Sequence, residues 1–383
     1  MIFAKERIDR QDYLFIPFLT AVIVFLIFIP TGFESLIDKK SEKVRGLIIE
    51  TDNSQVQQLG IVKVGTQLVK ARVLSGRFKG EIVSGTNPLI GSMELDKMFA
   101  PGDRALIGLD LEYNGKNIVS ANFIDHYRIT FEVILFGIFV LLLLLFAGWT
   151  GLKAIVSFVF TGLLIWKLLI PGFLKGYDPI FLSLGIVTAM TGAILFLIGG
   201  ITRKGLVAFL GAFLGIGLTC ALSILFEKGF RIHGAVRQFS ETLLYSGFPH
   251  LDLKKIFLAG IFLASSGAVM DLAMDISAAM KEVINKHPEI SRKDLILSGF
   301  TVAKAVIGTM TTTLLLAYSG GYTAMLMVFM AQGTPIFNVF NIIYVSSEVL
   351  HTLVGSFGLV TVAPFTALMG GLLFHKKEYG DKK

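Results

Sequence analysis

Residues 131–147 read FEVILFGIFVLLLLLFA, and this almost unbroken apolar stretch decides the class of the protein. An α-helix rises 1.5 Å per residue, so about 20 apolar residues cross a hydrocarbon core of about 30 Å. Similar stretches recur along the chain. Of the 383 residues, 54% are hydrophobic and only 16% are charged, which leaves too little polar surface to cover a water-soluble fold. We therefore predict an α-helical polytopic membrane protein in contact with the lipid bilayer.

About eight segments have the length and composition of membrane spans. The first follows Lys5, Arg7 and Arg10 and has no small-residue cleavage pattern behind it, so we expect an uncleaved anchor with a cytoplasmic N-terminus. If the chain then alternates across the membrane, Arg203 and Lys286, among other basic loop residues, fall on the cytoplasmic side. The predicted spans are residues 13–33, 131–147, 152–170, 180–199, 206–226, 256–280, 295–318 and 350–374.

The apolar run at residues 322–345 is interrupted in its middle by Gln332-Gly333-Thr334-Pro335. Glycine and proline break a helix, and the residue before proline is driven out of the helical region. A re-entrant hairpin of two half-helices on the outer side would keep Lys376 and Lys377 in the cytoplasm. Nine plain spans are the alternative, because the charges of a tail do not decide topology alone.

Residues 37–128 have a different sequence pattern, in which short runs of alternating apolar and polar residues are separated by turn residues. Asn87-Pro88, Pro101-Gly102-Asp103 and Asn114-Gly115 are interpreted as turns. Five or six strands in about 85 residues favour a small barrel of the OB or SH3 type, outside the cytoplasm because it follows the first span. The predicted parts are residues 1–36 (N-terminus and first span), 37–128 (extracytoplasmic β-rich domain), 129–376 (helical membrane domain) and 377–383 (cytoplasmic tail).

Several classes of function lack support in the sequence. The net charge of +7 lies mostly in short loops and in the β-rich insert, without interleaved aromatic residues, so we expect no nucleic acid partner. The single cysteine, Cys220, lies in an apolar run and excludes a disulfide framework. Because no nucleophile elbow or phosphate-binding glycine loop stands out, we do not expect an enzyme, and no metal or cofactor can be specified.

Ionisable residues inside spans are the first candidates for function, since each costs about 2.5–3.5 kcal/mol at the centre of an inserting helix. Asp271 and Asp275 are four residues apart, on one helix face, so either a cation lies between them or one holds a proton. Alternatively, Asp275 reaches the cytoplasmic interface and Asp271 bonds to a neighbouring helix. Lys304 either pairs with Asp271 at similar depth or extends to the interface.

Glu348 and His351 are three residues apart and follow the proposed hairpin. A carboxylate beside an imidazole suits a proton relay or a cation site, although both could equally lie in an outer loop in water. The hydroxyl of Thr309 could line a path or bond to its own helix. The candidate path for a substrate or ion comprises Asp271, Asp275, Lys304, Glu348, His351, Ser266, Thr309, Asn338, Gly333 and Pro335.

Three stretches carry a resemblance to a known family: SGAVMDLAM at residues 266–274, GTMTTTLLLAY at 308–318 and LVGSFGL at 353–359. They resemble the YibE/F-like family of bacterial multi-pass membrane proteins. The resemblance implies a location in the bacterial cytoplasmic (cell) membrane and a polytopic architecture, but no substrate. Related sequences are expected to have an arginine–aspartate pair where this chain has Lys304-Ala305, and an asparagine at Thr312.

Two functional hypotheses follow. In the first, the protein is a transporter or channel for an ion or small solute, which passes along intramembrane acids and a broken helix. In the second, it is a non-transporting scaffold or sensor whose outer β-domain binds a partner. The spacing of Gly211 and Gly215 allows close helix packing, either within one chain or in a homo-oligomer.

Overall fold

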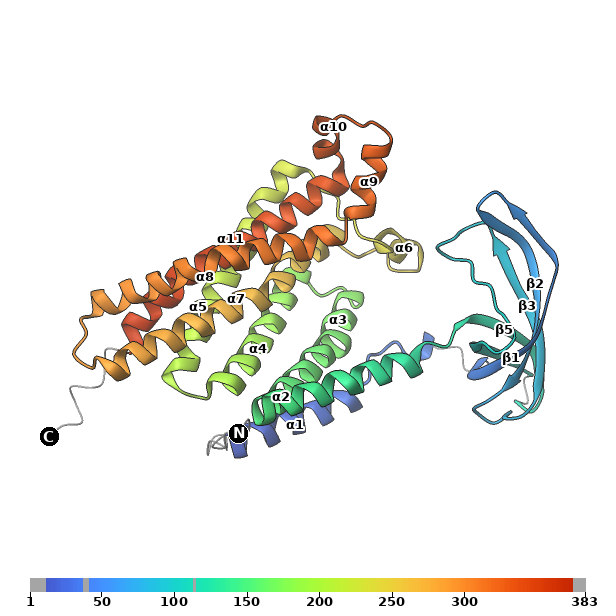
Figure 1. Ribbon diagram of the computed structural model, residues 1–383, viewed down its shortest axis with the longest axis horizontal. Coiled ribbons are helices and arrows are strands. Elements are labelled where there is room, and N and C mark those ends of the chain that lie inside the picture. The colour runs from blue at the N-terminus through green and yellow to red at the C-terminus, as the bar shows by residue number, and fades with distance from the viewer. Residues whose placement is uncertain (1–11, 37–40, 113–114, 375–383) are drawn as a thin grey trace. The chain divides into compact units, whose positions relative to one another are not determined.

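The computed structural model describes residues 12–36, 41–112 and 115–374, which form two units (Figure 1). The β unit spans Gly32–Leu142, and the helical unit contains the first helix together with Leu143 and the residues after it. Several residues used in the topology prediction lie outside the described parts of the chain: Lys5, Arg7, Arg10, Asn114, Lys376 and Lys377, together with the predicted tail at 377–383.

The β unit is one antiparallel sheet of five strands in the order β3-β2-β1-β4-β5. The sheet curls into a near-barrel that brings its two edge strands together. A Cβ atom on Gly85 of β3 would lie only 2.1 Å from the carbonyl oxygen of Ala121 in β5. The predicted small β-rich domain is therefore confirmed in outline, with β3 and β5 as its edge strands. The strands are β1 (Ser41–Leu59), β2 (Val62–Val73), β3 (Ile82–Ile90), β4 (Arg104–Leu111) and β5 (Ile118–His126).

Buried amides fix the irregular segment that follows β3. Gln67 and Asn87 are both fully buried. The Gln67 Oε1 atom accepts from the backbone N–H of Phe99 at 3.0 Å and from Asn87 Nδ2 at 3.1 Å. The predicted turn at Asn87-Pro88 is wrong, because both residues pair with β2 in the middle of β3. Proline is tolerated there because β3 is an edge strand.

The helical unit carries most of the predicted apolar spans, whereas residues 129–142, in the first apolar segment after the strands, belong to the β unit. Within the described part of the chain, six helical segments are long and apolar enough to cross a membrane, and α1 (Asp12–Phe28) is a shorter apolar helix. The six segments are Ile129–Leu174, Pro179–Gly199 (α4), Arg203–Phe230 (α5), Leu253–Lys286 (α7), Arg292–Gly320 (α8) and Ile343–Leu373 (α11).

The first of these segments is interrupted. It comprises α2 (Ile129–Leu164), a π-helical turn at Ile165–Leu169 and α3 (Ile170–Leu174). At 46 residues it is more than twice the length that a bilayer requires. Gly148 has the non-helical angles φ 48° and ψ −120°, so the backbone breaks where the sequence predicted the end of one span and the start of the next. Glycine adopts such angles without the steric penalty of a side chain.

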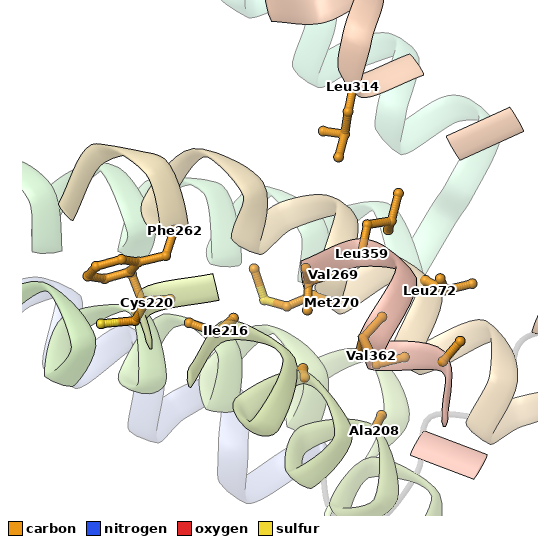
Figure 2. Close-up of a cluster of buried hydrophobic side chains, with 14 of the residues drawn as sticks. Ala208, Ile216, Cys220, Phe262, Val269, Met270, Leu272, Leu314, Leu359 and Val362 are labelled. Carbon is orange, nitrogen blue, oxygen red and sulfur yellow. The ribbon is translucent and has the colours of Figure 1, made fainter. Parts of the chain in front are cut away.

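The core of the helical unit lies between α5, α7, α8 and α11 (Figure 1). Figure 2 shows Ile216 of α5, Val269 of α7 and Val362 of α11 within one apolar cluster. Small residues allow α5 and α11 to approach closely, since a Cβ atom on Gly211 would lie 2.1 Å from Thr366 Oγ1. The Gly211 spacing noted in the sequence therefore serves packing within one chain.

Polar contacts at the two ends of the bundle agree with alternating spans. At one end, Ser277 Oγ donates to the carbonyl of Lys204 at 2.7 Å. At the other end, Lys255 Nζ lies 2.6 Å from Asp178 Oδ2. The hydrogen bond from Lys255, together with backbone N–H donors at the start of α4, holds the pKa of Asp178 below its usual value. These contacts place the beginning of α5 beside the end of α7, and the beginnings of α4 and α7 together.

The predicted break in the last apolar run is confirmed. Two short helices, α9 (Thr323–Ala331) and α10 (Ile336–Asn341), replace a single helix and are joined through Gln332–Pro335. Gly333 lies at the junction with φ 65°, a conformation that glycine adopts readily. α9 and α10 therefore form a hairpin between α8 and α11.

Candidate functional site

A buried ion-pair cluster lies at the beginning of α11. Glu348 and His351 are on one face of this helix, and only 9% and 7% of their surfaces are exposed. Arg237, from the segment between α5 and α6 (Ser240–Tyr245), reaches both side chains. Its Nη1 atom lies 2.7 Å from Glu348 Oε1, and its Nη2 atom lies 2.7 Å from His351 Nδ1. Since His351 Nδ1 is also 3.5 Å from Glu348 Oε2, the three groups form a closed triangle.

Aromatic side chains complete the surroundings of the cluster. The ring of Tyr318, on α8, lies 4.3 Å from the imidazole of His351, centroid to centroid. The hydroxyl of Tyr322 accepts a hydrogen bond from Arg237. The guanidinium also lies 5.7 Å from the ring centroid of Phe257 and 5.8 Å from that of Tyr322. A planar cation held between rings and a carboxylate has a fixed orientation.

The contact with arginine determines the tautomer of His351. Because a guanidinium can only donate, His351 Nδ1 accepts, and the proton of the neutral imidazole is on Nε2. His351 Nε2 and the Tyr318 hydroxyl are both buried and have no hydrogen-bond partner among the described residues. Both oxygens of Glu348 also lack a hydrogen bond of good geometry, although Arg237 is close enough for an ion pair. Such groups are rare in native proteins and are characteristic of sites that bind a ligand, an ion or water.

A groove of about 350 Å³ opens beside the cluster. The end of α8, the α9–α10 hairpin and the start of α11 line it, with Glu348 in its wall. Met325 of α9 and Phe340 of α10 are among the mainly apolar residues that line it, together with Tyr318 of α8. The broken helix thus forms one side of the groove, and Glu348 is the member of the buried cluster that lines it.

Comparison with known proteins assigns the family. The family model described as YibE/F-like protein matches residues 135–376, which is more than half of the chain. The chain belongs to the YibE/F-like family. The match begins in α2 and reaches past α11, so it includes Arg237, Glu348 and His351 of this YibE/F-like chain and excludes the five strands. Neither a comparison with curated proteins nor one with solved structures gives a match.

Several predicted path residues of the YibE/F-like chain lie elsewhere. Asp271 and Asp275 on α7 and Lys304 on α8 are exposed on the surface of the helical unit. Among the described residues, none of these three side chains has a hydrogen-bond or ion-pair partner, so Lys304 is not paired with Asp271 in a single chain. Of the predicted charged residues, only Glu348 and the neighbouring His351 belong to the buried cluster.

The remaining predicted residues have local roles or lie on the hairpin. Ser266 is buried and donates to the carbonyl of Leu263 at 2.7 Å. Thr309 is exposed and donates to the carbonyl of Val306 at 2.9 Å. Both hydroxyls are therefore satisfied by their own helices. Three further predicted residues are exposed on the α9–α10 hairpin, namely Gly333, Pro335 and Asn338.

Sequence reasoning missed Arg237, Tyr318 and Tyr322. Arg237 and His351 are 114 residues apart, so no local spacing connects them. The charged residues between 227 and 255 are scattered and form no recognisable pattern, so nothing in the sequence marks Arg237. Its role follows only from the packing of that segment on α11.

Proposed function

We propose that this YibE/F-like protein is a transporter or channel for an ion or small solute, and that the cluster of Arg237, Glu348 and His351 handles a proton or cation during transport. The main support for this proposal is that the titratable side chains of Glu348 and His351 are buried among apolar helices. Ionisable groups inside a membrane bundle are expensive, and those that persist mark ion pathways and proton relays more often than simple packing.

The triangular geometry supplies a mechanism. With Glu348 ionised, Arg237 binds the carboxylate and the imidazole together. Transfer of a proton to Glu348 removes the charge that attracts the guanidinium and leaves His351 Nδ1 and the Tyr322 hydroxyl as acceptors for Arg237. Arg237 belongs to the segment between α5 and α6, whereas the acid and the imidazole belong to α11. Proton binding would therefore loosen the contact between these two parts of the bundle and change access to the groove.

The broken helix supports the same function. Transporters often build substrate sites from discontinuous helices, whose irregular backbone lines protein or a water-filled cavity. α9 has nine residues and is about 13 Å long, which is less than half of the hydrocarbon thickness. We propose that the α9–α10 hairpin enters the outer half of the membrane and returns, and that the groove beside it admits the substrate.

The proposed topology has eight spans. They are the six apolar segments, with the first counted twice because of the break at Gly148, together with α1. An even number of spans places the two ends of the chain on one side. The positive-inside rule favours the cytoplasm of a bacterial cell for that side, which puts the β unit outside the cytoplasm.

A flux assay with the purified full-length protein in liposomes tests the proposal. Protons, monovalent and divalent cations and small anions are screened first, and Glu348→Gln and His351→Ala are then compared with the wild type. Glu227→Gln is the matched control, because Glu227 is also a buried carboxylate with a basic partner, Lys254 at 3.1 Å. We expect flux to be lost in the first two variants and kept in the control. Full flux through folded Glu348→Gln protein would refute the assigned role.

One observation favours the second candidate function, a scaffold or sensor. The turn between β1 and β2 exposes Leu59 and Ile61, at 56% and 82% of their surfaces. Ile90, across from Val64 on the neighbouring strand, is 67% exposed. Exposed apolar residues that gather into a patch are typical of protein-binding surfaces. If Leu59→Ser and Ile61→Ser abolish the cellular phenotype of the protein while flux in liposomes is absent from the wild type, the scaffold function is favoured.

A further inference from the structure

The outward face of α8 has the composition of a helix–helix interface. Thr301, Ala305, Gly308 and Thr312 lie along one face of the helix, and all four are exposed. A Cβ atom on Gly308 would meet no atom within 4 Å. Small and hydroxyl-bearing residues at this spacing let two membrane helices approach closely. By contrast, the first half of α2 exposes large apolar side chains, as contact with lipid requires.

Charges on and beside this face are incompatible with contact with lipid. Asp271 and Asp275 are exposed on α7, the neighbour of α8, and Lys304 is exposed on α8. Asp271 lies ten residues from Lys281, or about 15 Å along the helix, which is half the thickness of the hydrocarbon core. Charged groups at this depth face protein or water and not acyl chains. In a bilayer these charges therefore require either a covering protein surface or a water-filled path.

The depths of the three charges match. α7 and α8 are consecutive helices that meet at the loop between Lys286 and Arg292. Measured from those ends at 1.5 Å per residue, Asp275, Lys304 and Asp271 lie at about 16, 18 and 22 Å. Two copies in one membrane are related by an axis along the membrane normal, which leaves depth unchanged. Lys304 of one copy can therefore lie between the two carboxylates of another.

We propose that two copies of the chain associate through α8, so that Lys304 of each copy pairs with Asp271 and Asp275 of the other. The surface carries both signs of charge and the small residues that close packing requires, so it is complementary to itself, as a two-fold interface must be. A partner protein of different sequence would have to supply the same charges at the same depth. This assignment does not depend on the proposed transport function.

Cysteine cross-linking in native membranes tests the contact. The only cysteine, Cys220, is buried and is replaced by alanine to give a cysteine-free background. In that background, Gly308→Cys is expected to form a disulfide-linked dimer on mild oxidation. Ala221→Cys, on an exposed position of α5 about 27 Å from the start of that helix, is the control for Gly308, which lies about 24 Å from the start of α8, and it should remain monomeric. Cross-linking of the control but not of Gly308→Cys would overturn the interface.

Charge reversal tests the pairing. In lipid nanodiscs, single-molecule photobleaching should count two copies for the wild type and one for Lys304→Glu. The triple variant Lys304→Glu, Asp271→Lys, Asp275→Lys exchanges the signs and should recover the dimer, which misfolding of the single variant could not explain. A wild type that is monomeric in lipid, or an unchanged dimer in Lys304→Glu, would refute the proposal. A monomer whose flux depends on Asp271 would instead indicate a water-filled path along this face.

Discussion

Replacement of Glu348 by glutamine removes the only carboxylate that contacts Arg237 within the described residues. Loss of one partner from a buried ion pair costs about 3–5 kcal/mol, because the other charge is left uncompensated. The side chain of Arg237 is 39% exposed, however, so water can solvate the remaining guanidinium. We therefore expect Glu348→Gln to lower the free energy of unfolding by about 1–2 kcal/mol.

A double-mutant cycle isolates this contribution from other effects of the substitution. Glu348→Gln, Arg237→Gln and the double variant are unfolded by SDS titration in mixed micelles and followed by helical circular dichroism. We expect the double variant to be less destabilised than the sum of the two single variants by about 1 kcal/mol, since no unpaired charge remains. Glu241→Gln, at an exposed position of α6, should change stability by less than about 0.5 kcal/mol.

If Glu348→Gln costs as much in the Arg237→Gln background as in the wild type, the two groups are not coupled. The contact at 2.7 Å would then have no energetic meaning, and the cluster could not couple proton binding to movement.

Three further predictions concern other parts of the molecule. Gln67→Ala should destabilise the β unit by about 1–3 kcal/mol, because it removes the acceptor of the buried Phe99 N–H and one of the two acceptors of Asn87 Nδ2, which keeps only the carbonyl of Lys97. Hydrogen exchange in residues 91–103 should accelerate selectively. Gly211→Ala should cost about 1–3 kcal/mol in SDS titration, since its Cβ atom meets Thr366, whereas Gly217→Ala on the same helix has free space and should be neutral. Hydrogen bonds from the N–H groups of Ile90, Ser92 and Gly91 lower the pKa of Asp96. The contribution of Asp96 to the stability of the β unit is therefore present above the ordinary aspartate pKa and is lost as the pH falls through the lowered value. Asp96→Asn should remove this part of the acid sensitivity of the β unit.

Patterns that depend on local physics were predictable from the sequence. The apolar segments follow from helix length, and the break between α9 and α10 follows from the glycine and proline at 333 and 335. Alternation predicted the strands, yet Asn87-Pro88 was interpreted as a turn. Composition favours a turn for this pair, whereas the edge position of β3 and the hydrogen bonds of the Asn87 side chain determine its place in the sheet.

Long-range packing was not predictable in the same way. Glu348 and His351 were identified by their spacing on one helix face, but Arg237 joins them only after the segment beyond α5 folds back. Asp271 and Lys304 were considered as a pair because they lie at similar depth. Depth follows from residue counting, whereas the direction of a side chain around a helix depends on which neighbours that helix packs against. The side chains of Asp271 and Lys304 are both exposed on the surface of the helical unit and do not pair within one chain.

The central claim is that the buried cluster serves transport. Its most direct test is the flux of the transported ion or solute into liposomes containing equal amounts of folded wild-type, Glu348→Gln or Glu227→Gln protein. The account predicts flux through the wild type and Glu227→Gln and none through Glu348→Gln. Equal flux through all three proteins, or equal loss in both variants, would contradict it.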